Sequence, residues 1–156
     1  MTDEGEAGSI ADRALNPWLL LAIWCLVVPL PAAMGLGLFV THRSDYLGHY
    51  LAGYGATLFV AWLASRVAPA RPGVVVLATL VCVALGVVTE ATVFRIATFD
   101  RLDFFAQSAG AVLAGLAVLN TRTADGESFV DRGTEGALFA CVSGVYLMLG
   151  FVYAFA

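Results

Sequence analysis

The sequence predicts an all-α protein, a polytopic transmembrane helical bundle of about five spans, with four also possible. Of its 156 residues, 60 % are hydrophobic and only 13 % are charged, and the mean hydropathy is +0.86. The apolar residues fall into blocks close to the roughly 20 residues that a helix needs to cross about 30 Å of hydrocarbon. A chain of this length forms a single domain. We therefore expect one bundle whose solvent is the lipid bilayer.

The chain divides into a short tail and one helical region. Residues 1–15 carry four acidic residues and one arginine, unlike the basic start of a signal peptide, so we expect a disordered acidic N-terminal tail. Residues 16–156 contain all the apolar blocks and are predicted to form the transmembrane helical domain.

The first two apolar blocks predict spans that differ in regularity. Residues 16–40 include Pro29 and Pro31, which remove two backbone donors and should kink the helix in mid-span. Residues 46–65 form the second span, which ends before the stretch 66–73, rich in proline and containing a glycine.

Three further helices follow from the same reasoning. Residues 74–94 are β-branched and aliphatic almost throughout. After the polar connector 95–102, residues 103–119 form a fourth segment that is short for a full span. The loop 120–134 is the most polar stretch, and the last helix begins at about residue 135 and runs to the C-terminus.

Small residues at four-residue spacing predict close helix packing. This spacing lets helix backbones approach each other in lipid. It occurs in three segments, as Gly48, Ala52 and Ala56, as Ala106, Gly110 and Ala114, and as Gly136, Ala140 and Gly144.

The charged residues exclude several functions and favour one orientation. All eight basic residues are arginine, so chemistry that needs a lysine amine, such as a Schiff base or a P-loop nucleotide site, is excluded. The net charge of −4 argues against nucleic acid as a partner. We expect a multi-pass protein of the cell membrane. With five spans, five arginines lie on the same side of the membrane as the N-terminus and three on the opposite side, which favours a cytoplasmic N-terminus. An acidic chain without lysine is typical of a halophilic or GC-rich prokaryote.

Four ionisable residues are predicted to meet at one membrane face. Asp45 and His49 are four residues apart and share one face of the second helix. Glu90 lies about one turn before the end of the third helix, and Asp103 lies at the start of the fourth. These three helix ends fall on the same side of the membrane in either orientation. Because ionisable groups are costly inside a membrane, we expect a polar site of four candidate catalytic residues working as acid–base groups.

Four polar neighbours are candidates for binding at the same site. They are Arg95, Asp100, Arg101 and Gln107. Arg95 or Arg101 is the expected ion-pair partner of Glu90. Structural roles compete with these functions, because Asp45 and Asp103 each suit the cap of a helix start.

The chain contains no complete signature of a nucleophile or a metal site. A histidine beside carboxylates could transfer protons or hold a divalent metal. The three cysteines, however, lie in separate apolar blocks without metal-ligand spacing, and we predict no metal site and no cofactor.

The stretch Asp45-Tyr-Leu-Gly-His49-Tyr50 resembles the Asp-Lys-x-x-His-Phe signature of the VanZ-like membrane protein family. Glu90 followed by Thr-Phe-Asp100-x-x-Asp103-x-x-x-Gln107-x-x-Gly110 is similar to the second signature of that family. The chain departs from the pattern at Tyr46 in place of lysine, Val93 in place of glutamine and Gln107 in place of asparagine, and its interval from Glu to Asp is about two residues shorter. The resemblance implies an integral membrane protein without a settled reaction, in a family sometimes associated with reduced susceptibility to glycopeptide antibiotics.

Two functions remain open at this point. In the first, the polar site near one membrane face acts on or binds an envelope lipid or a lipid-linked substrate. In the second, the protein is a non-catalytic structural or interaction protein, whose polar cluster locks the second, third and fourth helices together. Its partner is then a membrane lipid or another membrane protein. Whether the protein is an enzyme is not decided by the sequence.

Overall fold

The computed structural model describes residues 17–35, 44–92, 100–122 and 126–154. Within these ranges the chain forms helices and no strand, so the all-α class is confirmed. Three helices are long and apolar enough to cross a membrane, Pro72–Thr92, Arg101–Asn120 and Gly133–Tyr153, and Leu19–Met34 is a shorter apolar helix. The number of candidate spans shown is thus smaller than the five predicted. The predicted N-terminal tail lies outside the described residues.

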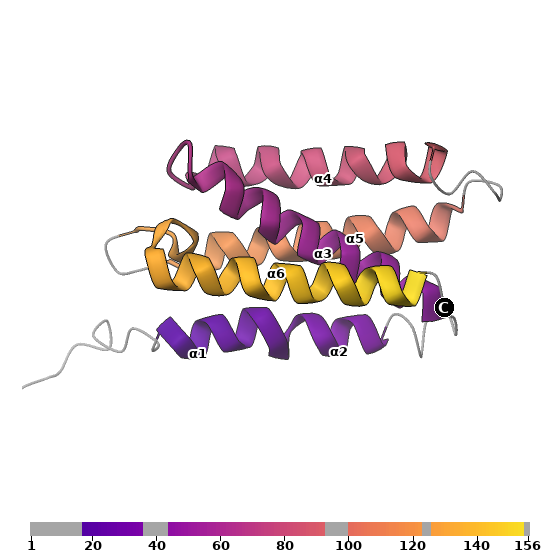
Figure 1. Cartoon of the computed structure of the whole chain (residues 1–156), viewed down its shortest axis with the longest axis horizontal. Helices are drawn as coiled ribbons and strands as arrows, with labels where there is room; N and C mark the ends of the chain where they lie inside the picture. The colour runs from indigo at the N-terminus through magenta and orange to yellow at the C-terminus, as the bar shows by residue number, and fades with distance from the viewer. Residues whose placement is uncertain (1–16, 36–43, 93–99, 123–125, 155–156) are drawn as a thin grey trace, which may run out of the picture.

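The helices run back and forth along the long axis of the bundle. In chain order the elements are α1 (Pro17–Ala22), the π-helical turn η2 (Ile23–Val27), α2 (Pro29–Met34), α3 (Ser44–Ser65), α4 (Pro72–Thr92), α5 (Arg101–Asn120), the 3-10 turn η4 (Phe129–Asp131) and α6 (Gly133–Ala154). Figure 1 shows α1, η2 and α2 as one continuous rod, and it places the start of α1 and the end of α6 at opposite ends of the bundle.

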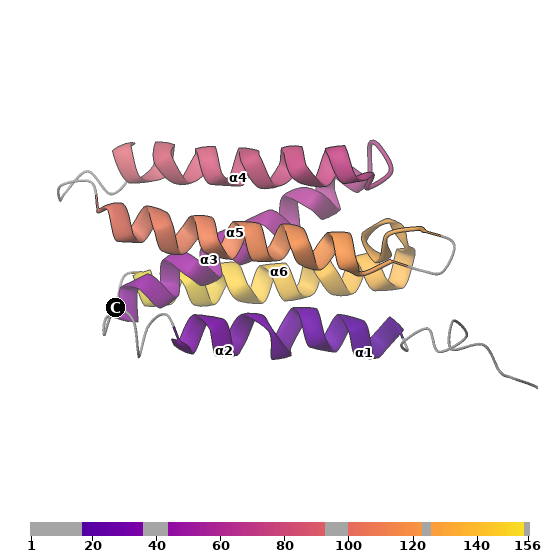
Figure 2. The same ribbon diagram turned by 180° about the vertical axis from the view of Figure 1, so that it is seen from behind.

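Helix α3 crosses the bundle obliquely, and its main packing partners are α5 and α6 (Figure 2). It has 22 residues, as many as α6, but is not one of the three candidate spans. Its tyrosines, glycines and His49 lower its hydropathy. Several of these residues contact other helices, since His49, Tyr50 and Tyr54 are buried. A helix in this central position can be less apolar than one on the outside of the bundle.

Glycine allows α3 and α5 to approach within backbone contact. A Cβ atom on Gly110 would overlap the carbonyl oxygen of Tyr50, and one on Gly53 would overlap that of Gln107. Ala106 and Ala114, the other members of the predicted ridge on α5, are also buried. On α6, by contrast, Gly144 is exposed and has no atom near its Cβ position, so the ridge predicted there does not pack along its whole length.

The interruption predicted around Pro29 is present as a π turn immediately before that proline. The Val28 N–H donates to the carbonyl oxygen of Ile23, five residues earlier, at 2.8 Å. This bond leaves the carbonyl oxygen of Trp24 without its usual donor. Since Pro29 has no N–H, the carbonyl oxygen of Cys25 also lacks one.

Two buried tyrosines donate to these freed carbonyl oxygens. The Tyr54 hydroxyl donates to Trp24, and the Tyr146 hydroxyl donates to Cys25. Because an unpaired carbonyl is costly away from water, these bonds fasten the first rod to α3 and α6.

The end of the bundle where α4 begins is fastened by bonds between two connectors. Asp131 accepts the Ala70 N–H on both carboxylate oxygens, at 3.0 and 3.1 Å. Arg122 donates to the Ala70 carbonyl oxygen at 2.9 Å, and Arg132 lies 3.5 Å from Glu135. Polar groups at this end therefore have clear structural roles.

Candidate functional site

The other end of the bundle brings three helix ends together, as the up-and-down connection predicts. Here α3 begins, α4 ends and α5 begins, and all three lie at the same side in Figure 1. The polar residues singled out in the sequence lie on these turns.

His49, Glu90 and Asp103 form a compact cluster, one residue from each of the three helices. Nε2 of His49 lies 3.5 Å from Oδ1 of Asp103. One ligand atom from each residue, a ring nitrogen or a carboxylate oxygen, lies within 4.8 Å of the other two. His49 and Glu90 are each 8 % exposed. The predicted convergence of these three residues is therefore present, with His49 and Glu90 buried and Asp103 half-buried.

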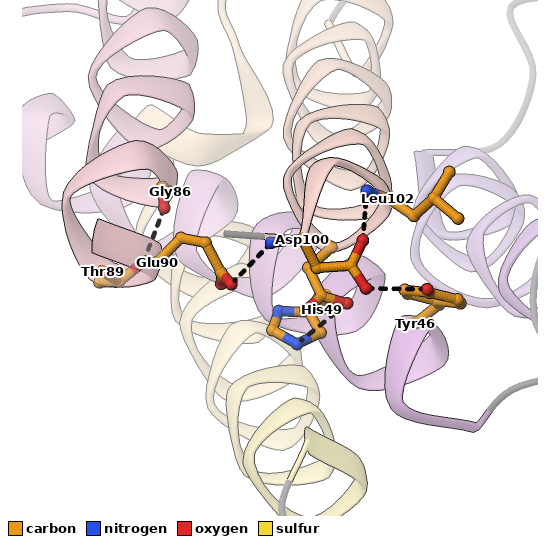
Figure 3. Close-up of polar contacts among 8 residues, drawn as sticks. Tyr46, His49, Gly86, Thr89, Glu90, Asp100 and Leu102 are labelled. Carbon is orange, nitrogen blue, oxygen red and sulfur yellow. Dashed lines mark hydrogen bonds and ion pairs between the residues drawn. The ribbon is translucent and has the colours of Figure 1, made fainter. Parts of the chain in front are cut away.

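Asp100 connects the same three helices by its backbone and its side chain. It is the N-cap of α5, where its Oδ1 accepts the Leu102 N–H at 2.8 Å. Its Oδ2 accepts the Tyr46 hydroxyl of α3 at 3.0 Å, and its own N–H donates to Oε1 of Glu90 at 3.4 Å (Figure 3). The cap of α5 is thus Asp100, not Asp103, and Asp103 is left in the first turn with its carboxylate toward His49.

The predicted arginine partner of Glu90 is not found among the described residues. Arg101 is exposed and forms no ion pair within those ranges, so its pairing with Glu90 is wrong there, and Arg95 lies outside them. Oδ1 of Asp103 is shielded from solvent and accepts no hydrogen bond from any described residue. The cluster therefore holds two carboxylates and one imidazole, with no described arginine to balance them.

Asp45 occupies a different position from the other three candidates. It lies in the first turn of α3, one turn before His49, and is half-buried. It is not a member of the described group whose ligand atoms come within 4.8 Å of one another.

A partly open cavity of about 310 Å³ begins at the His49 ring. Three polar residues line it, His49 of α3, Thr89 of α4 and Gln107 of α5, and most of the remaining wall is apolar. That wall includes Ala52, Ala56, Leu85, Leu147 and Phe151. Residues of α4 and α6 line opposite sides of the cavity, and the described backbones of these two helices lie mostly apart, so the cavity lies between them over α3.

Sequence reasoning missed this cavity and the network of Asp100. One signal was available in Gly86, which lies one turn before Glu90. A Cβ atom there would come within 2.8 Å of Nε2 of Gln107, so the glycine makes room for a half-buried amide beside the cavity. Gly86 is thus the sequence feature that marks the close approach of Gln107 to α4.

The fold and the cluster define a class of protein. It is a helical bundle with helices able to cross a membrane and a buried histidine–carboxylate cluster at one end. Comparisons with protein-family models, with curated proteins and with solved structures found no match.

Proposed function

We propose that the protein is a five-span integral membrane protein that binds an envelope lipid or a lipid-linked molecule. The two additional spans are the α1–η2–α2 rod and α3. At 1.5 Å per residue, the 22 residues of α3 extend about 33 Å, enough to cross the hydrocarbon core. The polar residues of α3 that lower its hydropathy are covered by neighbouring helices, which supports a span inside the bundle.

The arginines support an orientation with the cluster on the outer face of the cell membrane. Arg66, Arg71, Arg122 and Arg132 lie on the turns at the end opposite the cluster, whereas Arg101 is the described arginine at the cluster end. The positive-inside rule then assigns the arginine-rich end, with the start of α1, to the cytoplasm.

The cavity is the observation that carries the lipid proposal. Its apolar wall suits an acyl or isoprenoid chain, and its polar residues lie where the chain would meet a head group. Because the described backbones of α4 and α6 lie mostly apart, a chain can enter sideways from the bilayer. The His49 cluster then contacts the head group.

The test fills the cavity and measures lipid binding. Phosphatidylglycerol with a fluorescent acyl chain is titrated with the full chain in detergent, and binding is followed by anisotropy. Ala56→Trp places an indole in the cavity and should lower affinity at least about 10-fold, a loss of about 1.4 kcal/mol. Ala137→Trp, at an exposed position on α6, should bind like the wild type. Leu147→Trp fills the cavity from α6 and replaces Ala56→Trp if that variant does not fold. Equal affinity in all variants would refute the proposal.

The second candidate is a structural lock, which the network of Asp100 favours. Asp100 joins α3, α4 and α5 through Tyr46 and Glu90. A protein with this function alone should lose folded material when His49→Ala or Glu90→Gln is introduced, and its wild type should not bind the lipid probe.

A further inference from the structure

We propose that His49, Glu90 and Asp103 form a binding site for a divalent transition-metal ion, with Zn²⁺ as its first candidate. Three residues that are far apart in the sequence present a ring nitrogen and two carboxylate oxygens within 4.8 Å of one another. These groups are ligands that Zn²⁺ takes in proteins. The binding of the ion by itself does not depend on the proposed lipid function.

Charge is the first argument for a cation. Glu90 is buried and Asp103 is half-buried, and two carboxylates this close together repel each other unless a proton or a cation lies between them. Glu90 lies in the last turn of α4, where the free carbonyl groups add further negative potential. Neither carboxylate is paired with an arginine in the part of the chain that the structure describes. A bound divalent ion removes this imbalance.

The unused acceptor on Asp103 is the second argument. Its Oδ1 is shielded from solvent, accepts no hydrogen bond from the described residues and lies nearest to His49. Six buried side-chain atoms of the described residues lack a hydrogen-bond partner, and Oδ1 of Asp103 is the one carboxylate oxygen among them. A carboxylate oxygen in this state calls for an explanation more than a hydroxyl does. A metal ion would use this oxygen directly.

The distances fit a small tetrahedral ion. Bonds of about 2.1 Å to Zn²⁺ place neighbouring ligand atoms about 3.4 Å apart. The contact between His49 and Asp103 is already 3.5 Å. The carboxylate of Glu90 needs to move by roughly 1 Å, which rotations in its flexible side chain allow. Mixed nitrogen and oxygen ligands favour Zn²⁺ or Mn²⁺ over Ca²⁺, which prefers six to eight oxygen ligands.

The surroundings suit a site with an open coordination position. The N–H of Asp100 donates to Glu90 and orients its carboxylate, as outer hydrogen bonds do at metal sites. Three protein ligands leave room for a fourth, and His49 also lines the cavity. On the proposed lipid function, the ion would supply the positive charge that binds a phosphate head group, which the carboxylates alone would repel.

The test titrates metal into the full chain after removal of ions with EDTA. ZnCl₂ and MnCl₂ are added separately to detergent-solubilised protein in a calorimeter, and the expected stoichiometry is one ion per chain. His49→Gln, Glu90→Gln and Asp103→Asn should each lower the affinity at least about 10-fold. Two controls should leave it unchanged. They are Glu135→Gln, at a glutamate that is also 8 % exposed but lies at the other end of the bundle, and Arg132→Gln, beside that glutamate.

Two measurements keep the inference testable if a variant does not fold. Co²⁺ bound to the wild type should give absorption bands of a four- or five-coordinate ion without a thiolate charge-transfer band. Absence of metal binding by the wild type, or equal binding by the three variants, would overturn the site. The head-group role is tested separately, because EDTA should weaken binding of the phosphatidylglycerol probe at least about 10-fold. If the protein binds zinc but EDTA does not change its lipid affinity, the head-group role is rejected and the metal site is retained. If the protein binds the lipid but not zinc, the metal site is rejected and the lipid proposal is retained.

Discussion

A carboxylate oxygen of Glu90, in the last turn of α4, lies within 4.8 Å of a carboxylate oxygen of Asp103, in the first turn of α5. The two charges have opposite relations to their own helices. The negative charge of Asp103 is favourable near the N-terminus of a helix, whereas that of Glu90 is unfavourable near a C-terminus. In the metal-free protein the hydrogen bond from the Asp100 N–H favours the Glu90 carboxylate, whereas its position at the helix end and its closeness to Asp103 oppose it. A bound cation would offset both unfavourable interactions.

Glu90→Gln should stabilise the metal-free protein. The amide keeps the size and one acceptor oxygen, but it removes the repulsion from Asp103 and the unfavourable interaction with the end of α4. We expect the free energy of unfolding to rise by about 1 kcal/mol in EDTA. Glu135→Gln is the matched control, for which the free energy of unfolding should fall instead of rise. Glu135 lies in the first turn of α6 beside Arg132, so its negative charge is favourable there. Denaturant unfolding in detergent measures both, and a less stable Glu90→Gln would contradict the charge argument.

Zinc should make the wild type more stable than Glu90→Gln, the reverse of their order in EDTA. At a free concentration of 100 times its dissociation constant, a ligand that binds only the folded state stabilises it by about 2.7 kcal/mol. The wild type should gain this amount, whereas Glu90→Gln, whose affinity for zinc is at least about 10-fold lower, should gain at most about 1.4 kcal/mol. The wild type then becomes the more stable of the two. The Glu135→Gln control should respond to zinc like the wild type. A zinc response of the same size in Glu90→Gln would contradict this prediction.

The helices were predictable because their ends carry strong local signals. The segment predicted at 46–65 is observed at Ser44–Ser65, and that predicted at 74–94 is observed at Pro72–Thr92. Proline and polar residues mark these ends whatever the surrounding fold. The convergence of His49, Glu90 and Asp103 was predictable too, since it follows from the order of the spans and from the position of each residue near a helix end.

The details that depend on helix rotation were not predictable. Asp100 and Asp103 are both suitable caps by sequence, and the choice of Asp100 depends on where the chain turns into α5. The cavity depends on the separation of α4 and α6, which no local pattern encodes. In the same way, nothing local indicates that Tyr146 reaches a carbonyl oxygen on the first helical rod.

Gly110→Ala should destabilise the bundle strongly. The added methyl group would overlap the carbonyl oxygen of Tyr50, so α3 and α5 must move apart. Overpacking of this kind costs about 1 to 3 kcal/mol. Gly144→Ala is the control, because no atom lies near its Cβ position and alanine favours the helix, so its stability should be equal or slightly higher. Thermal unfolding of the two purified variants compares them, and an equal loss in both would indicate that the contact with Tyr50 carries no weight.

Tyr146→Phe should cost about 1 kcal/mol of stability, and Pro29→Ala should remove most of that cost. The phenylalanine leaves the carbonyl oxygen of Cys25 without a donor in a buried position. In the Pro29→Ala background, residue 29 has an N–H that can donate to Cys25 four residues earlier, so the hydroxyl is no longer needed there. A double-mutant cycle on unfolding free energies measures the coupling, which should be about 0.5 to 1 kcal/mol. Tyr153→Phe, at an exposed tyrosine of α6, should cost nothing in either background. If Tyr146→Phe costs the same with and without Pro29, the proline is not the reason that this tyrosine binds the carbonyl.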